Sequence, residues 1–116
     1  MKVPILVALA LATAPALAGP SLTLDLGPEA DVQSLRYLCD GDRSLSVQYV
    51  NTDANSLAMM TLDGGERIFV NVIAASGARY VSGAHEWWTK GDAATLTDLT
   101  GTADALDCRA DPGQGR

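Results

Sequence analysis

The stretch "RSLSVQYV", residues 43–50, alternates apolar and polar side chains, and this alternation decides the fold class. In an extended chain Leu45, Val47 and Tyr49 share one face, and the polar residues between them share the other. A period of two is typical of a strand that buries one face. Because "ERIFVNVIA" (66–74) and "ATLTDLT" (94–100) continue the pattern, the sequence predicts an all-β fold.

Turn signals separate the alternating stretches at regular intervals. They are "DGD" at 40–42, "NTDAN" at 51–55, "DGG" at 63–65, "SGA" at 76–78 and "KGD" at 90–92. Short strands at this spacing predict an antiparallel sandwich or a small barrel, and a barrel leaves fewer exposed edges. We expect eight strands, near residues 35–39, 43–50, 56–62, 66–74, 79–83, 85–90, 93–99 and 104–108.

The first 18 residues have the features of a signal peptide. Lys2 is followed by the apolar stretch "ILVALALATA", and "ALA" at 16–18 fits a signal-peptidase site, so we expect cleavage after Ala18. The apolar run is too short to span a bilayer comfortably. No Cys stands near the cleavage site to carry a lipid. The sequence therefore predicts an exported protein that is not lipid-anchored and whose mature chain has no integral membrane segment.

The remainder of the chain is long enough for one domain only. We expect residues 19–34 to form an N-terminal tail or an edge strand, because Leu22, Leu24 and Leu26 alternate between two prolines. Residues 35–108 would form the barrel, and residues 109–116 a flexible C-terminal tail.

The chain has two cysteines, Cys39 and Cys108. In an exported protein a disulfide is the simplest interpretation, and closing so long a loop stabilises the fold by up to roughly 4 kcal/mol. A zinc site would need more ligands than two Cys and the single His85 provide. We therefore expect one disulfide, no metal and no cofactor.

The charge balance is acidic. The whole chain has 8 basic and 14 acidic side chains and a net charge of −6; without Lys2 the mature chain has −7. This balance argues against nucleic acid and anionic membrane surfaces as partners. It permits fast association with a basic partner, although many exported proteins are acidic simply for solubility.

Ser76 precedes the segment 79–90 and lies beside Gly77, and Lys90 ends that segment and lies beside Gly91. If the chain folds back near Ser82-Gly83, the two residues come together at one rim of the barrel. They could be a catalytic pair, two solvated turn residues, or a pair that binds a partner's anionic cleft. Catalysis would need a buried Lys and an oxyanion hole, and no G-x-S-x-G or S-x-x-K pattern is present.

Neighbouring residues have plainer interpretations. We expect Gly77 and Gly91 to supply backbone freedom for the two loops, and Tyr80 to brace the first loop by packing. Arg79 could brace the loop or meet a partner. Trp87 and Trp88 should face opposite sides of a strand, one in the core and one available as an anchor at an interface.

The chain resembles the MliC/PliC family, the bacterial inhibitors of C-type lysozyme. The resemblance rests on "YLCD" at 37–40, "LSVQY" at 45–49, "ASGARY" at 75–80, "WTKGDAA" at 88–94 and the late Cys108. It implies an eight-stranded antiparallel barrel with one disulfide. It also implies that Ser76 and Lys90 enter the lysozyme's active-site cleft.

The resemblance thus predicts a non-enzymatic inhibitor, with no catalytic residue of its own, whose partner is a C-type lysozyme. The cell's own muramidases or lytic transglycosylases are alternative targets. Many family members are lipoproteins, but this chain lacks the lipid-bearing Cys and so is similar to the soluble periplasmic branch. The alternative function is an exported small barrel that binds a hydrophobic ligand or an envelope component.

Overall fold

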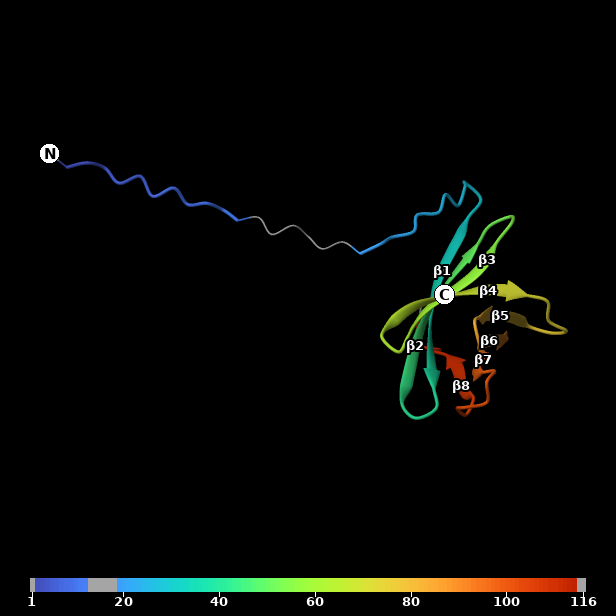
Figure 1. Cartoon of the computed structure of the whole chain (residues 1–116). Coiled ribbons are helices and arrows are strands. Elements are labelled where there is room, and N and C mark those ends of the chain that lie inside the picture. Colours follow the sequence, from blue (N-terminus) through green and yellow to red (C-terminus); the bar gives the residue numbers. More distant parts are fainter. Residues whose placement is uncertain (1, 13–18, 115–116) are drawn as a thin grey trace.

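The computed structural model describes residues 2–12 and 19–114, and its regular structure consists of β-strands. Each strand pairs antiparallel with the next, and the last pairs with the first, which closes an eight-stranded barrel (Figure 1). The predicted fold class is therefore confirmed. The strands are β1 (Asp31–Cys39), β2 (Arg43–Asn51), β3 (Ser56–Leu62), β4 (Gly65–Val72), β5 (Ala78–Ser82), β6 (His85–Lys90), β7 (Ala93–Asp98) and β8 (Leu106–Ala110).

Three strands differ from their predicted bounds by two residues or more. β1 begins at Asp31 rather than at residue 35, because its first half pairs with the end of β2, Asp31 opposite Asn51. Most side chains there are exposed, so apolar alternation did not mark this half of the strand. β4 ends at Val72 instead of residue 74, and β8 spans Leu106–Ala110 instead of 104–108.

The segment that follows β8 is bound to β1. The Asp111 backbone N–H donates to the Arg36 carbonyl over 2.9 Å, and the Arg36 guanidinium pairs with the Asp111 carboxylate. The Gln114 side-chain amide accepts from the Arg36 N–H (2.7 Å) and donates to its carbonyl (2.8 Å). Residues 111–114, expected to be part of a flexible tail, are thus hydrogen-bonded to the barrel.

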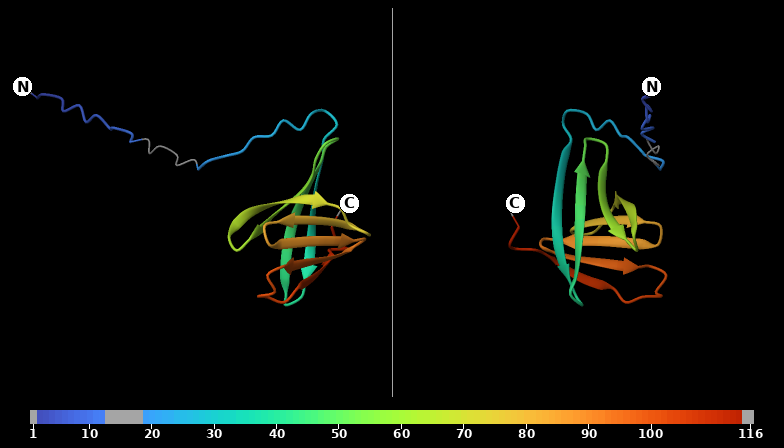
Figure 2. Two further views of the ribbon diagram at one scale, coloured as in Figure 1. Left: turned by 45° about the vertical axis from the view of Figure 1, so that its right-hand side comes forward. Right: turned by 90° about the vertical axis from the view of Figure 1, so that its left-hand side faces the viewer.

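The described residues that precede Asp31 lie outside the barrel (Figure 2). The described residues before Asp31 form no strand, so the leucine alternation at residues 22–26 does not add an edge strand. The described residues also include no helix long and apolar enough to cross a bilayer. The predicted cleavage motif at 16–18 lies outside the residues that the structure describes.

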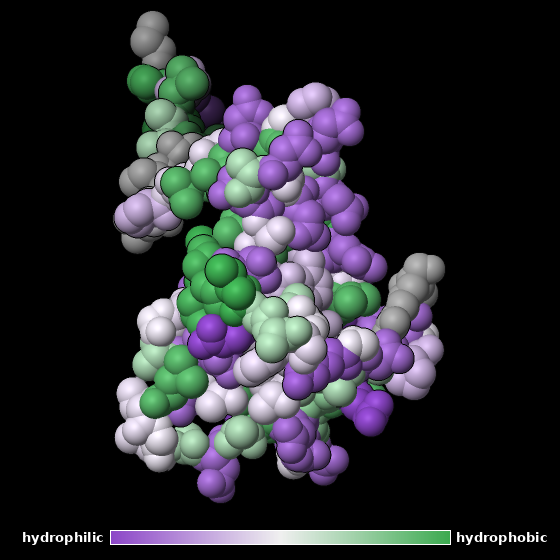
Figure 3. Space-filling view, turned by 90° about the vertical axis from the view of Figure 1, so that its right-hand side faces the viewer, coloured by the Kyte–Doolittle hydropathy of each residue, from purple (hydrophilic) through white to green (hydrophobic). Residues whose placement is uncertain are grey.

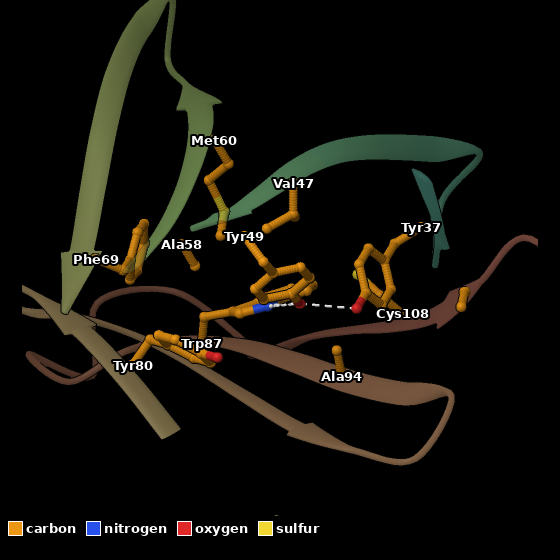
Figure 4. Packing of buried hydrophobic residues seen from close by; sticks show 11 residues of the cluster. Tyr37, Val47, Tyr49, Ala58, Met60, Phe69, Tyr80, Trp87, Ala94 and Cys108 are labelled. Atoms are coloured by element: carbon orange, nitrogen blue, oxygen red, sulfur yellow. Dashed lines mark hydrogen bonds between the residues drawn. The ribbon is translucent and has the colours of Figure 1, made fainter. Parts of the chain in front are cut away.

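Large side chains fill the barrel interior (Figure 4). Trp87, Phe69, Met60 and Val47 are each less than 2% exposed. A barrel that binds a hydrophobic ligand needs an apolar cavity along its axis. Because side chains occupy this volume, the structure favours a function carried by the outer surface. One face of that surface mixes hydrophobic patches with hydrophilic residues (Figure 3).

Three aromatic side chains satisfy one another's polar groups inside the core. The Trp87 indole Nε1–H donates to the Tyr49 hydroxyl over 2.9 Å, and this hydroxyl lies 2.7 Å from that of Tyr37. The Tyr37 and Trp87 rings meet edge to face, with centroids 5.0 Å apart. A buried indole N–H without an acceptor would be costly, so Tyr49 fixes how Trp87 fits the core.

A disulfide joins Cys39 and Cys108, as predicted. The two residues face each other across β1 and β8 in register, with Cα atoms 4.0 Å apart. β1 pairs with β2 along its whole length but with β8 only from Tyr37 to Cys39. The covalent bond therefore lies where the closing ladder of the barrel is short.

We expect the barrel to lose stability in alkaline solution. Burial raises the pKa of Tyr49 well above its usual value, and burial also raises the pKa of Tyr80. In the unfolded chain both groups release protons near pH ~10, so the stability that they contribute is complete below this pH and is lost above it. The free energy of unfolding in urea should fall by about 1.4 kcal/mol per pH unit for each tyrosine that stays protonated.

Tyr49→Phe provides the control. At pH ~8 it should cost about 1–3 kcal/mol, because the Trp87 indole N–H loses its acceptor. Above pH ~10 its stability should fall less steeply than that of the wild type, because one titrating group has been removed. A wild-type free energy of unfolding that stays constant from pH ~9 to ~11 would contradict the prediction.

Candidate functional site

The antiparallel pairing of β5 and β6 brings Ser76 and Lys90 to the same end of the barrel. Ser76 lies in the loop that precedes β5, and Lys90 is the last residue of β6. The two strands turn at residues 83–84, which is the fold-back that the sequence predicted. Both Ser76 and Lys90 are exposed. The pair is therefore available to a partner at one rim.

Gly77 allows the Ser76 loop to lie directly against the end of β6. Its φ is +66°, in the left-handed region, and a Cβ at this position would lie 2.1 Å from the Thr89 carbonyl oxygen. The same Cβ would lie 2.9 Å from Lys90 Cγ, so the Lys90 stem packs over Gly77. The Thr89 hydroxyl also donates to the Ala78 carbonyl over 3.3 Å. No larger residue would permit this approach.

Trp88 contacts both site residues. Its indole Nε1–H donates to the Ser76 carbonyl over 2.9 Å, and the Lys90 Nζ lies 4.8 Å from its ring centroid. Trp87 is fully buried whereas Trp88 is half-buried, as the alternation of adjacent residues predicted. Neither contact was predicted from the sequence. The signal was present in the period of two, because residues 88 and 90 share one face of the strand.

Arg79 forms an ion pair within the protein. Its guanidinium Nε–H donates to Glu86, whose side chain is only 12% exposed. The Arg79 Cζ also lies 5.9 Å from the Trp88 ring centroid. Of the two roles left open for Arg79, these contacts favour bracing the site. Glu86, whose role the sequence did not define, compensates the Arg79 charge.

Tyr80 supports the site from the barrel core, and Gly91 supports it from the turn that follows Lys90. Tyr80 is buried, and its ring centroid lies 5.7 Å from that of Tyr49 in the core. Gly91 has φ +58° in the two-residue turn between β6 and β7. The turn predicted at "KGD" (90–92) is therefore confirmed, and it directs the chain back directly after Lys90.

The arrangement suits binding better than catalysis. A Lys that acts as a base must shed its proton, which burial normally promotes, but Lys90 is exposed to solvent. Beside it lies a shallow hollow of about 260 Å³, whose lining includes Trp88 and the outward face of β7 at Thr95 and Thr97. Among the residues that the structure describes, no group of His, Cys, Asp and Glu side chains is arranged to hold a metal ion.

The chain matches one protein family and two curated proteins. The family described as "Membrane-bound lysozyme-inhibitor of c-type lysozyme" matches residues 37–105. A protein of Cupriavidus necator, named membrane-bound lysozyme inhibitor of C-type lysozyme, is 44% identical over 86 residues, or 71% of this chain and 69% of that protein. A protein of the same name from Pseudomonas aeruginosa is 45% identical over 76 residues, 65% of this chain and 60% of that protein.

The solved structures that match this chain include one of MliC and one of PliC-St. Pseudomonas aeruginosa MliC, crystallised in complex with hen egg white lysozyme, superposes with a TM-score of 0.64 at 36% identity, covering 85% of this chain and all of that one. PliC-St, a periplasmic lysozyme inhibitor from Salmonella typhimurium, gives a TM-score of 0.63 and covers 70% of this chain and 99% of its own. At 24% identity the second likeness supports the fold alone.

Two glycine substitutions test the packing of the Ser76 loop. Gly77→Ala and Gly91→Ala both place a Cβ at a left-handed residue, which costs about 1–2 kcal/mol. Only Gly77→Ala also drives that Cβ into a backbone oxygen, whereas Gly91 has open space around it. Gly77→Ala should therefore lower the free energy of unfolding in urea by about 2 kcal/mol more than Gly91→Ala. Equal losses would refute the close approach.

Proposed function

The chain belongs to the MliC family of C-type lysozyme inhibitors, and we propose that it inhibits such a lysozyme by inserting Ser76 and Lys90 into the active-site cleft. The observation that carries this proposal is that one exposed rim holds a hydroxyl and a cation together. The Pseudomonas aeruginosa relative crystallised in complex with hen egg white lysozyme supports the choice of partner.

The chemistry of the two groups complements the enzyme's catalytic machinery. A C-type lysozyme uses one protonated carboxyl as an acid and one ionised carboxylate. The Ser76 hydroxyl can donate to or accept from a carboxyl, and the Lys90 ammonium would form a charge-assisted hydrogen bond with the carboxylate. The described residues include no carboxylate within ion-pair distance of Lys90. The Lys90 charge is thus available to the enzyme. With Ser76 and Lys90 in the cleft, the inhibitor would exclude the sugar substrate.

The location follows from the N-terminal features. We propose that residues 1–18 are a signal peptide and that the mature inhibitor acts in the periplasm without a lipid anchor. The relatives named above are described as membrane-bound, and the Salmonella typhimurium protein as periplasmic. The leader and the absence of a nearby Cys support the periplasmic alternative for this chain. It acts as an inhibitor and not as an enzyme.

Removal of the Lys90 charge should weaken binding strongly. Truncating one partner of a desolvated charge pair costs about 2–5 kcal/mol, so Lys90→Ala should raise the Kd for a C-type lysozyme roughly 30- to 5000-fold. Calorimetric titration and a cell-wall clearing assay would measure the Kd and the inhibition, with Ser76→Ala tested in parallel. The cell's own muramidases and lytic transglycosylases should be titrated as alternative targets.

Arg43→Ala is the matched control, because it removes one positive charge from an exposed residue at the other end of the barrel. Arg43 and His85 line the same hollow there, and His85 begins β6 whereas Lys90 ends it. This variant should bind within about twofold of the wild type. If Lys90→Ala folds normally by circular dichroism and its Kd for the lysozyme rises tenfold or less, Lys90 does not have the proposed role.

The acidic surface should accelerate association with a basic lysozyme. With a net charge of −7 after loss of Lys2 (7 basic and 14 acidic side chains), the mature protein attracts a cationic enzyme over distances that salt screens. Stopped-flow measurements should give an association rate constant about tenfold lower in ~0.5 M salt than in ~0.05 M salt, with a smaller change in dissociation. An association rate independent of salt would remove electrostatic steering from the proposal.

A further inference from the structure

Trp88 is the one side chain for which we find a polar or cation–ring contact to each of Ser76 and Lys90 among the described residues. Its indole N–H binds the Ser76 backbone carbonyl, which leaves the Ser76 hydroxyl uncommitted by this contact. The Lys90 ammonium lies over its ring at 4.8 Å, the distance of a cation–π interaction. The two contacts use different parts of one rigid ring system.

The surroundings of Trp88 hold this ring in place. On β5, its cross-strand neighbour is Arg79, whose guanidinium is fixed by Glu86. On the opposite side, Thr95 of β7 is its partner in register. A Trp side chain has only two rotatable bonds, so little freedom remains once both neighbours are ordered. Trp88 can therefore transmit the order of the sheet to the exposed rim.

Without this ring, both site residues would gain freedom. The Ser76 carbonyl would lose its donor, and the loop would be held through the close approach of Gly77 to Thr89 and to the Lys90 stem. The Lys90 side chain has four rotatable bonds, and a long exposed side chain pays an entropic cost when a partner immobilises it. A ring that already restrains both groups lowers this cost before the enzyme arrives.

We propose that Trp88 is a positioning residue, which in the free protein orders the Ser76 loop and the Lys90 ammonium for binding and does not act as a direct anchor on the enzyme. This inference rests on the proposed function for its effect on affinity. Its structural part concerns the free protein alone and is tested there separately.

Two substitutions separate the two contacts. Trp88→Phe keeps an aromatic face for Lys90 but removes the indole N–H, so the Kd for a C-type lysozyme should rise about 3- to 10-fold. Trp88→Leu removes both contacts, and the Kd should rise about 10- to 50-fold. Met59→Ala trims another large, half-buried outward side chain, on β3, and should leave the Kd within about twofold. Thermal unfolding would check that each variant is folded.

Double-mutant cycles distinguish positioning from direct contact. If Trp88 acts through the Ser76 hydroxyl, Trp88→Phe should change the Kd by no more than about twofold in the Ser76→Ala background. The effects of Trp88→Leu and Lys90→Ala on the binding free energy should likewise be less than additive, because Leu removes the ring under Lys90. The effects of Trp88→Phe and Lys90→Ala should be additive, because Phe keeps an aromatic face. Full additivity in the Ser76 cycle would overturn the inference, because an independent anchor or a general loss of stability gives that result.

The free protein provides a readout that needs no lysozyme. In ¹⁵N relaxation measurements, Trp88→Phe should lower the backbone order parameters of Ser76 and Gly77 and leave those of the turn at residues 83–84 unchanged. Unchanged order parameters in the Ser76 loop would overturn the inference even if affinity falls. If the wild type fails to bind any lysozyme while the loop loosens as expected, the proposed function fails and the structural part of the inference stands.

Discussion

The orientation of the Trp87 side chain is the constraint on which the rest of the structure depends. Its indole is fully buried and needs the Tyr49 hydroxyl as its acceptor, so this face of β6 must point inwards. The period of two then forces Trp88 and Lys90 outwards. The core thereby decides which side chains of β6 face the outer surface of the barrel.

The two cations near Trp88, Arg79 and Lys90, differ in whether a carboxylate is paired with them. Arg79 and Lys90 lie near the same indole ring, but Arg79 is paired with the largely buried Glu86. Lys90 is exposed, and among the residues that the structure describes it has no ion pair with a carboxylate. In the proposed complex, long-range attraction to a basic enzyme would coexist with short-range attraction to its carboxylates, because the two act over different distances.

Two features hold the barrel closed where β8 pairs with β1. The ladder between β1 and β8 is short, and the Cys39–Cys108 disulfide lies within it. Beyond the ladder, the Gln114 side chain satisfies both backbone groups of Arg36 in place of a neighbouring strand. A closed barrel holds the paired β5 and β6 rigidly, and this rigidity lets a backbone approach at Gly77 define the geometry of an exposed loop.

Local patterns in the sequence determined the strands, the turns and the rim shared by Ser76 and Lys90. These features follow from the period of two and from glycines in tight turns, which depend on near neighbours only. Tertiary structure alone decided the early start of β1, the binding of residues 111–114, the Arg79–Glu86 pair and the two contacts of Trp88. Each of these joins residues on different strands or distant in the chain, and hydropathy along one strand does not reveal which outward side chains meet across the sheet.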